Sequence, residues 1–227
     1  MKKYIILGLV ALLMSSCAQQ TLVTRESQYP LMYQERPLAI AIMPPINQTN
    51  HVEAKDFFYT TLYAPLCEKG YYVYSPMMTM EMFQAESAYD AEMFIEGDLS
   101  QFRNVLGADA AMFTIIKSWK RNNVGGKITA GVEYILRSTK TGETLYKREG
   151  LISVDTSVSG GGGGIFGALV NIAATAIATA ATDKVVAGRV CTAFVLSDMP
   201  EGKYGTLYDK DQKTPAGKSY IKATVKK

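Results

Sequence analysis

The stretch "KITAGVEYILRSTKTGETLYKREGLISVDTS", from Lys127 to Ser157, decides the fold. In its first half every second residue points to one face, and these residues are Ile128, Ala130, Val132, Tyr134 and Leu136. An alternation with period two is typical of a half-buried strand. Lys140-Thr141-Gly142 predicts a turn, so the stretch folds back on itself as an antiparallel pair. "AAMFTIIKSWKRN" (110–122), followed by a turn at Gly125-Gly126, predicts a third strand of this meander.

Upstream of the meander, the sequence predicts a parallel unit. "LAIAIMPP" (38–45) is a short apolar strand that two prolines end, and "YYVYS" (71–75) is a second strand. A helix over about residues 50–70 lies between them, and a helix between two strands favours parallel pairing. We therefore predict an α/β fold, a mixed parallel/antiparallel sheet flanked by helices in three layers. One domain spans 37–199 and includes a C-terminal helical segment.

The N-terminus predicts a lipoprotein signal peptide over residues 1–16. Met1-Lys2-Lys3 is basic, residues 4–14 are apolar, and Ser15-Ser16-Cys17 follows, which resembles a bacterial lipobox. Acylation of Cys17 would anchor the chain stably in a membrane. Ala18, in place of an aspartate, is typical of sorting to the outer membrane, facing the periplasm. Residues 17–36 are polar and predict a tether between the lipid and the domain.

The charge pattern excludes nucleic acid as a partner. The net charge is +3, and without Lys2 and Lys3 it is +1, far from the basic stripe of a nucleic-acid-binding face. Residues 200–227 hold seven lysines and three acidic residues, a local charge of +4, with few large apolar residues. This composition predicts a basic, flexible tail.

The run "SGGGGGIFGALVNIAATAIATAA" (159–181) has several interpretations. A phosphate-binding loop is disfavoured, because the lysine of a P-loop is missing and the preceding strand ends a meander. A membrane span is disfavoured because residues 165–182 are short, rich in alanine and interrupted by Asn171. We favour a glycine hinge followed by a helix packed on protein. A segment that changes partner on oligomerisation stays open.

Few residues suggest chemistry. His51 is the only histidine, and it forms a candidate ligand loop with Asn47 and Asn50 after the first strand. A zinc site needs three or four protein ligands, so we predict no metal site, no catalytic residues and no cofactor. In an oxidising compartment Cys67 and Cys191 pair as a disulfide or stay as two small buried thiols, and both alternatives remain open.

Several short motifs together resemble a known family. They are "RPLAIAIMPPINQT", "APLCEKGYYVYS", "LGADAAMFTIIKSW", "VEYILRSTKTGETLY" and a later "GR", spread over roughly residues 36–210. As a set they are similar to the meningococcal-type lipoprotein family of unknown function. The resemblance implies a fold like the TolB N-terminal domain and the periplasmic part of CsgG, and envelope lipoproteins found with CsgG-like lipoproteins. It implies no catalytic residues.

Three functional hypotheses follow. The first is a non-enzymatic outer-membrane lipoprotein, a structural or assembly component that self-associates or binds CsgG-like or other envelope lipoproteins. The second is a CsgG-like secretion-pore component whose 159–199 segment remodels on assembly. The third is a periplasmic ligand-binding module or enzyme that uses the loop Asn47–His51. We expect the first, as a homo-oligomer attached to the membrane through lipid on Cys17.

Overall fold

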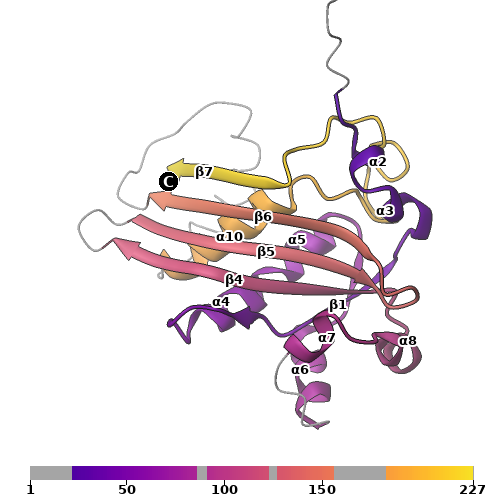
Figure 1. Cartoon of the computed structure of the whole chain (residues 1–227), viewed down its shortest axis with the longest axis horizontal. Helices are drawn as coiled ribbons and strands as arrows, with labels where there is room; N and C mark the ends of the chain where they lie inside the picture. The colour runs from indigo at the N-terminus through magenta and orange to yellow at the C-terminus, as the bar shows by residue number, and fades with distance from the viewer. Residues whose placement is uncertain (1–21, 86–90, 123–126, 156–182, 227) are drawn as a thin grey trace, which may run out of the picture.

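The computed structural model describes residues 22–85, 91–122, 127–155 and 183–226 (Figure 1). Its centre is a seven-stranded sheet in the order β3-β1-β4-β5-β6-β7, with β2 also paired to β4. The strands are β1 (Ala39–Ile42), β2 (Ile46–Asn47), β3 (Tyr72–Val73), β4 (Ala110–Asn122), β5 (Lys127–Ser138), β6 (Thr144–Asp155) and β7 (Tyr220–Lys226). β3, β1 and β4 run parallel, whereas β4, β5 and β6 form an antiparallel meander. The predicted mixed α/β sheet is confirmed.

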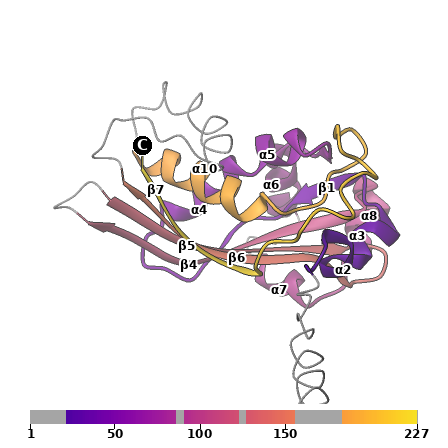
Figure 2. The ribbon, with the colours of Figure 1, turned by 90° about the horizontal axis from the view of Figure 1, so that it is seen from above.

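Helices cover both faces of this sheet. They are α2 (Arg25–Gln28), α3 (Pro30–Glu35), α4 (Ala54–Thr61), α5 (Tyr63–Glu68), α6 (Pro76–Ala85), α7 (Glu92–Ile95), α8 (Ser100–Leu106) and α10 (Asp183–Leu196). Figure 2 shows α10, α4 and α5 on one side of the sheet and α7 on the other. The predicted C-terminal helical segment is present as α10, although the chain continues beyond it into β7.

The main core lies between the sheet and α10. All five β5 residues that the alternation assigns to one face are buried there, each at most 1 % exposed. α10 lies close to α4 at Gly188, where an added Cβ would lie 3.4 Å from the Thr61 Cγ2. A second core on the opposite face packs the rings of Phe83, Phe94 and Phe102 near Phe113. The alternation in β5 therefore predicts which of its residues face the main core.

The C-terminal tail is ordered, and the prediction of a flexible segment is wrong. β7 pairs in parallel with β6, with Ile221 opposite Gly150 and Val225 opposite Val154. Val225 is 7 % exposed, and Ile221 and Ala223 pack against the main core. Within β7, Lys222 lies at an alternate position and is exposed, so a lysine there is compatible with a strand.

The predicted tether is also partly wrong. α2 and α3 lie within residues 17–36, and Tyr29 and Met32 are each only 4 % exposed in the main core. The folded body therefore begins near Thr24, not after Arg36. Cys17, the turn at Gly125-Gly126 and the glycine run with its apolar sequel to residue 182 lie outside the described residues. Among the helices of the described part, none is long and apolar enough to cross a bilayer.

Candidate functional site

At one place the N-terminal end of the described chain meets the segment that joins α10 to β7. We call it the terminal junction: α2, α3 and residues 197–219 (Figure 1). Residues 23–26 run antiparallel to residues 212–216, and Thr24 forms a bridge with Pro215. Arg25 N donates to the Thr214 carbonyl at 2.9 Å, and Ala216 N donates to the Val23 carbonyl at 2.7 Å. The point at which the chain enters the folded body is thus fixed to its C-terminal segment.

A buried charge network holds the junction together. The Arg25 guanidinium donates from Nη1 to Asp211 Oδ2 at 3.0 Å and from Nε to Asp198 Oδ1 at 3.4 Å. The Tyr29 hydroxyl donates to Asp198 at 2.9 Å, and the Tyr33 hydroxyl donates to Asp211 at 3.0 Å. Burial raises the pKa of both phenols well above the ordinary value, and the neighbouring carboxylates raise it further. The phenols therefore stay protonated and serve as donors.

Arg148 extends this network to the sheet. From β6 its Nε donates to the Lys218 carbonyl at 2.9 Å, and its Nη1 donates to the Val195 carbonyl and the Ser197 Oγ, each at 3.1 Å. Two arginines and two aspartates, Arg25, Arg148, Asp198 and Asp211, give a formal charge of zero. Buried charges are tolerated when they are paired and hydrogen-bonded in this way. The arrangement joins α2, α3 and the C-terminal segment to the sheet.

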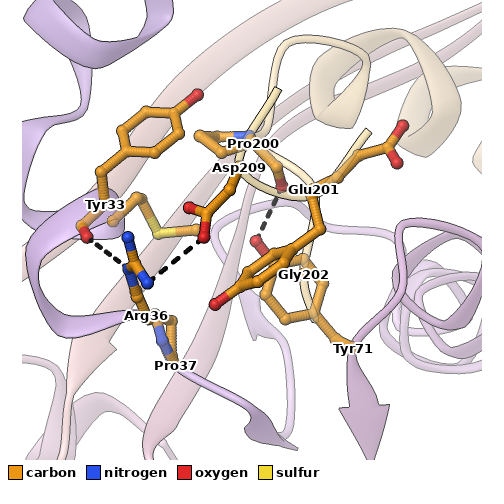
Figure 3. Close-up of a pocket in the computed structure, with 10 residues that line it drawn as sticks. Tyr33, Arg36, Pro37, Tyr71, Pro200, Glu201, Gly202 and Asp209 are labelled. Carbon is orange, nitrogen blue, oxygen red and sulfur yellow. Dashed lines mark hydrogen bonds and ion pairs between the residues drawn. The ribbon is translucent and has the colours of Figure 1, made fainter. Parts of the chain in front are cut away.

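A small cavity lies at the surface of the junction (Figure 3). The end of α3, the residue before β3 and the C-terminal segment line it, and the residues are Met32, Tyr33, Arg36, Pro37, Tyr71, Pro200, Glu201, Gly202, Tyr208 and Asp209. The Tyr71 hydroxyl donates to the Pro200 carbonyl at 2.7 Å, and Arg36 pairs with Asp209 at 3.2 Å. The volume is about 10 Å³, space for about one water molecule. This cavity is too small for an organic ligand.

A wider hollow of about 220 Å³ lies beside α3 and carries mixed charge. Its lining is Gln34, Glu35, Pro37, Arg103, Asp109 and Lys140. Both carboxylates are engaged. Glu35 accepts from the hydroxyls of Ser138 and Thr141, while Asp109 Oδ2 accepts from two backbone amides at 3.0 Å. Because their oxygens bind the protein itself, these acids hold loops in place.

Part of the sheet face opposite α10 is open. We define the open face by Lys117, Thr129, Glu133, Lys147, Glu149, Leu151, Ser153, Tyr220, Lys222 and Thr224. Lys117 bridges Glu133 and Glu149 at 2.9 and 2.7 Å, and Lys147 binds Glu133 at 2.9 Å. Burial alone would raise the pKa of Glu133, but the two lysines hold it below its ordinary value. This polar face continues to β7, whose outer edge pairs with no strand among the described residues.

The loop predicted as a ligand site folds on itself. Asn47 Oδ1 accepts from the Thr49 amide at 3.0 Å and from the Thr49 hydroxyl at 2.8 Å, and Asn47 Nδ2 donates to the His51 carbonyl at 2.8 Å. Asn50 and His51 are exposed. The structure thus brings Asn47 and His51 together through a turn, and a ligand-binding role for the loop stays a prediction.

Cys67 and Cys191 are not bonded in the structure. Cys67 is exposed on α5, whereas Cys191 is buried on α10 with its Sγ 3.8 Å from the Ala130 carbonyl. The structure thus lacks the disulfide, and the alternative of two buried thiols holds for Cys191 but not for Cys67. Among the described residues, no group of three or more His, Cys, Asp or Glu side chains could hold a metal ion. Sequence reasoning missed the terminal junction altogether, because its partners lie more than 160 positions apart.

Comparison with known proteins identifies relatives of this chain. The family described as "Putative lipoprotein GNA1162-like" matches residues 27–204. The "Putative lipoprotein NMB1124/NMB1162" of Neisseria meningitidis is 25% identical over 185 residues, 80% of this chain and 84% of that protein. The crystal structure of lipoprotein GNA1162 from Neisseria meningitidis is similar in fold. Its TM-score is 0.50 at 22% identity, over 63% of this chain and all of that one. A PelC dodecamer from Paraburkholderia phytofirmans has a TM-score of 0.43 at 16% identity, over 71% of this chain and 88% of that one, too low for any inference about assembly.

Proposed function

Since the chain belongs to the GNA1162-like lipoprotein family, we propose that it is a non-enzymatic outer-membrane lipoprotein. It is anchored by acylated Cys17, faces the periplasm, and acts as a structural or assembly component. It does so by self-association or by binding other envelope lipoproteins. The lipobox and the family support the anchor, and the open sheet with its free edge supports the binding role.

The observation that carries the binding role is the outer edge of β7. Glu149 N donates to the Ser219 carbonyl at 2.9 Å. In a parallel pair, every second residue of a strand directs its backbone N–H and C=O to the same neighbouring strand. Ser219 and every second residue after it therefore face β6, and the backbone groups of Tyr220, Lys222 and Thr224 point away from β6. Such an edge is a template for pairing with a strand of another chain. The buried acids Asp198 and Asp211 bind Arg25 and two tyrosines and so serve the fold.

The anchor is tested with Cys17→Ser. The variant should move from the membrane fraction to the soluble fraction, because the acyl chains supply the attachment. Mass spectrometry of the mature wild-type chain should show a lipid-modified Cys17. An unmodified Cys17 on mature protein would refute the anchor.

Self-association is tested with Thr224→Pro. Proline removes an edge N–H that makes no bond to β6, so the fold should persist while pairing with a partner strand is lost. The matched control is Thr224→Ala, which removes the same side chain and keeps the N–H. We expect the wild type and Thr224→Ala to sediment as small oligomers in detergent and Thr224→Pro as a monomer.

Two outcomes would contradict self-association through the β7 edge. A monomeric wild type would exclude self-association. An oligomer that Thr224→Pro leaves unchanged would exclude the β7 edge as its interface. A large ring in detergent would instead favour the secretion-pore alternative.

A further inference from the structure

The surface around the entry point of the chain combines exposed apolar and basic side chains. Leu22 is 72 % exposed and Val23 is 53 % exposed. The strand-like segment bonded to residues 23–26 carries Lys213, and Lys210 and Lys218 flank it, all three exposed. We call this the entry surface: Leu22, Val23, Lys210, Lys213 and Lys218.

The lysines give the entry surface a positive charge. Glu26 is the exposed acid on α2, so three positive charges and one negative charge leave +2. Among the other charges of residues 22–36 and 197–219, those of Arg25, Asp198 and Asp211 are buried in the network. Asp209 is paired with Arg36 at 3.2 Å, and Glu35 accepts from the hydroxyls of Ser138 and Thr141. Glu201 and Lys203 carry opposite charges. No ion pair joins the three lysines to another described residue. Their ammonium groups are therefore available to an external anion.

The length of the chain limits how far this surface can lie from a membrane. Only four residues lie between Cys17 and Leu22, and even when fully extended the five steps from Cys17 to Leu22 span about 18 Å. The junction then fixes the entry point to the rigid body through backbone bonds and Arg25. If Cys17 is acylated, as the proposed function requires, the entry surface lies at the bilayer and can touch it.

We infer that the entry surface docks on the leaflet that holds the Cys17 acyl chains, with its lysines on anionic phospholipid headgroups and Leu22 and Val23 in the interfacial region. Basic residues beside a lipid anchor are attracted to anionic lipids, and apolar side chains insert at the headgroup boundary. Docking would fix the orientation of the body. Figure 1 shows α2 at the end of the sheet opposite the C-terminal end of β4, so that end of β4 would point away from the bilayer.

The test uses the mature chain, beginning at residue 17, with Cys17→Ser. Without acyl chains, any binding to vesicles comes from the protein surface. Sedimentation is compared on vesicles of phosphatidylcholine alone and of phosphatidylcholine mixed with phosphatidylglycerol. We expect binding to the anionic vesicles, lowered about tenfold or more when Lys210, Lys213 and Lys218 are changed to Glu. The matched control changes three other lysines, Lys120, Lys127 and Lys222, to Glu and should lower binding far less.

A second pair of changes tests the apolar part. Leu22→Ser with Val23→Ser leaves the backbone bonds of the junction in place and should weaken binding to the mixed vesicles as well. Equal binding to both vesicle types, or equal losses in the two triple-lysine variants, would overturn the inference. This failure is distinct from a failure of the anchor. The anchor is measured by the modification of Cys17, whereas these chains carry no acyl group.

Discussion

Neutralising Asp211 should destabilise the whole protein, although it lies in a segment whose composition is typical of a disordered tail. Asp211 is 1 % exposed and accepts from Arg25 Nη1, the Tyr33 hydroxyl and the Glu201 amide, each at 3.0 Å. Asp211→Asn keeps the shape and one acceptor but removes the charge opposite Arg25. A hydrogen bond to a charged group contributes about 1.5–3 kcal/mol, so we expect a loss of about 2 kcal/mol. For a body of this size that is a fall in Tm of about 4–8 °C.

The matched control is Asp209→Asn, two residues away. Asp209 pairs with Arg36 at 3.2 Å, but both side chains are largely exposed, and such pairs contribute at most about 1 kcal/mol. Its φ is 55°, and asparagine tolerates this left-handed conformation, so the backbone should not add a cost. Thermal unfolding followed by circular dichroism measures both variants. Equal Tm values for the two variants would refute the reasoning, because they would show that the buried charge of Asp211 stabilises the fold no more than an exposed one.

Three further predictions concern the core, the thiols and the turns. Ile42→Asp puts a charge at a fully buried position of β1, so it should cost more than about 4 kcal/mol and abolish the folded circular dichroism spectrum. In the mature chain with Cys17→Ser, maleimide should label Cys67 but not buried Cys191 until the protein is unfolded. Partial desolvation raises the pKa of the exposed Cys67 thiol, so its labelling should begin at a higher pH than that of a cysteine in a short peptide. A chain in which neither thiol reacts before unfolding and reduction would indicate a disulfide. Gly70→Ala should prevent native packing, because its Cβ would lie 2.0 Å from the backbone nitrogen of Gly205. In Gly142→Ala the new Cβ meets nothing closer than 3.4 Å, so this variant should cost about 1 kcal/mol, which unfolding in urea would measure.

The sheet could be predicted because its signal is local. Residues 127–155 alternate with period two around the turn at Gly142, and the predicted strand 110–122 has the bounds of β4. The same alternation identifies the face of β5 that packs against the main core. Pairing beyond neighbouring strands carries no such signal. Nothing in "YIKATVK" (220–226) specifies β6 as its partner, yet its alternating Ile221, Ala223 and Val225 were available as evidence for a strand.

The tail differs from the prediction because composition says nothing of periodicity. Seven lysines favour a solvated segment, but four of them precede β7, and a strand with one solvated face accommodates Lys222 between the inward-facing Ile221 and Ala223. The candidate sites show the same limit of reasoning from residue types. Residue types suggest a ligand site in the loop after β2, but in the structure the side-chain oxygen and nitrogen of Asn47 form hydrogen bonds within the turn itself. The terminal junction has no signature in residue types, since its arginines and aspartates resemble surface charges until the fold buries them.

The junction changes the way an anchor at Cys17 would act on the body. With a tether to Arg36, the body would be free to turn beneath the membrane. Instead the chain is fixed from Val23 onward, first by backbone bonds to residues 214–216, then by Arg25 to Asp198 and Asp211. Arg148 continues the connection into β6, the central strand between β5 and β7. If Cys17 is acylated, a force on the lipid would therefore reach the sheet through the backbone bonds and the buried charges of the junction.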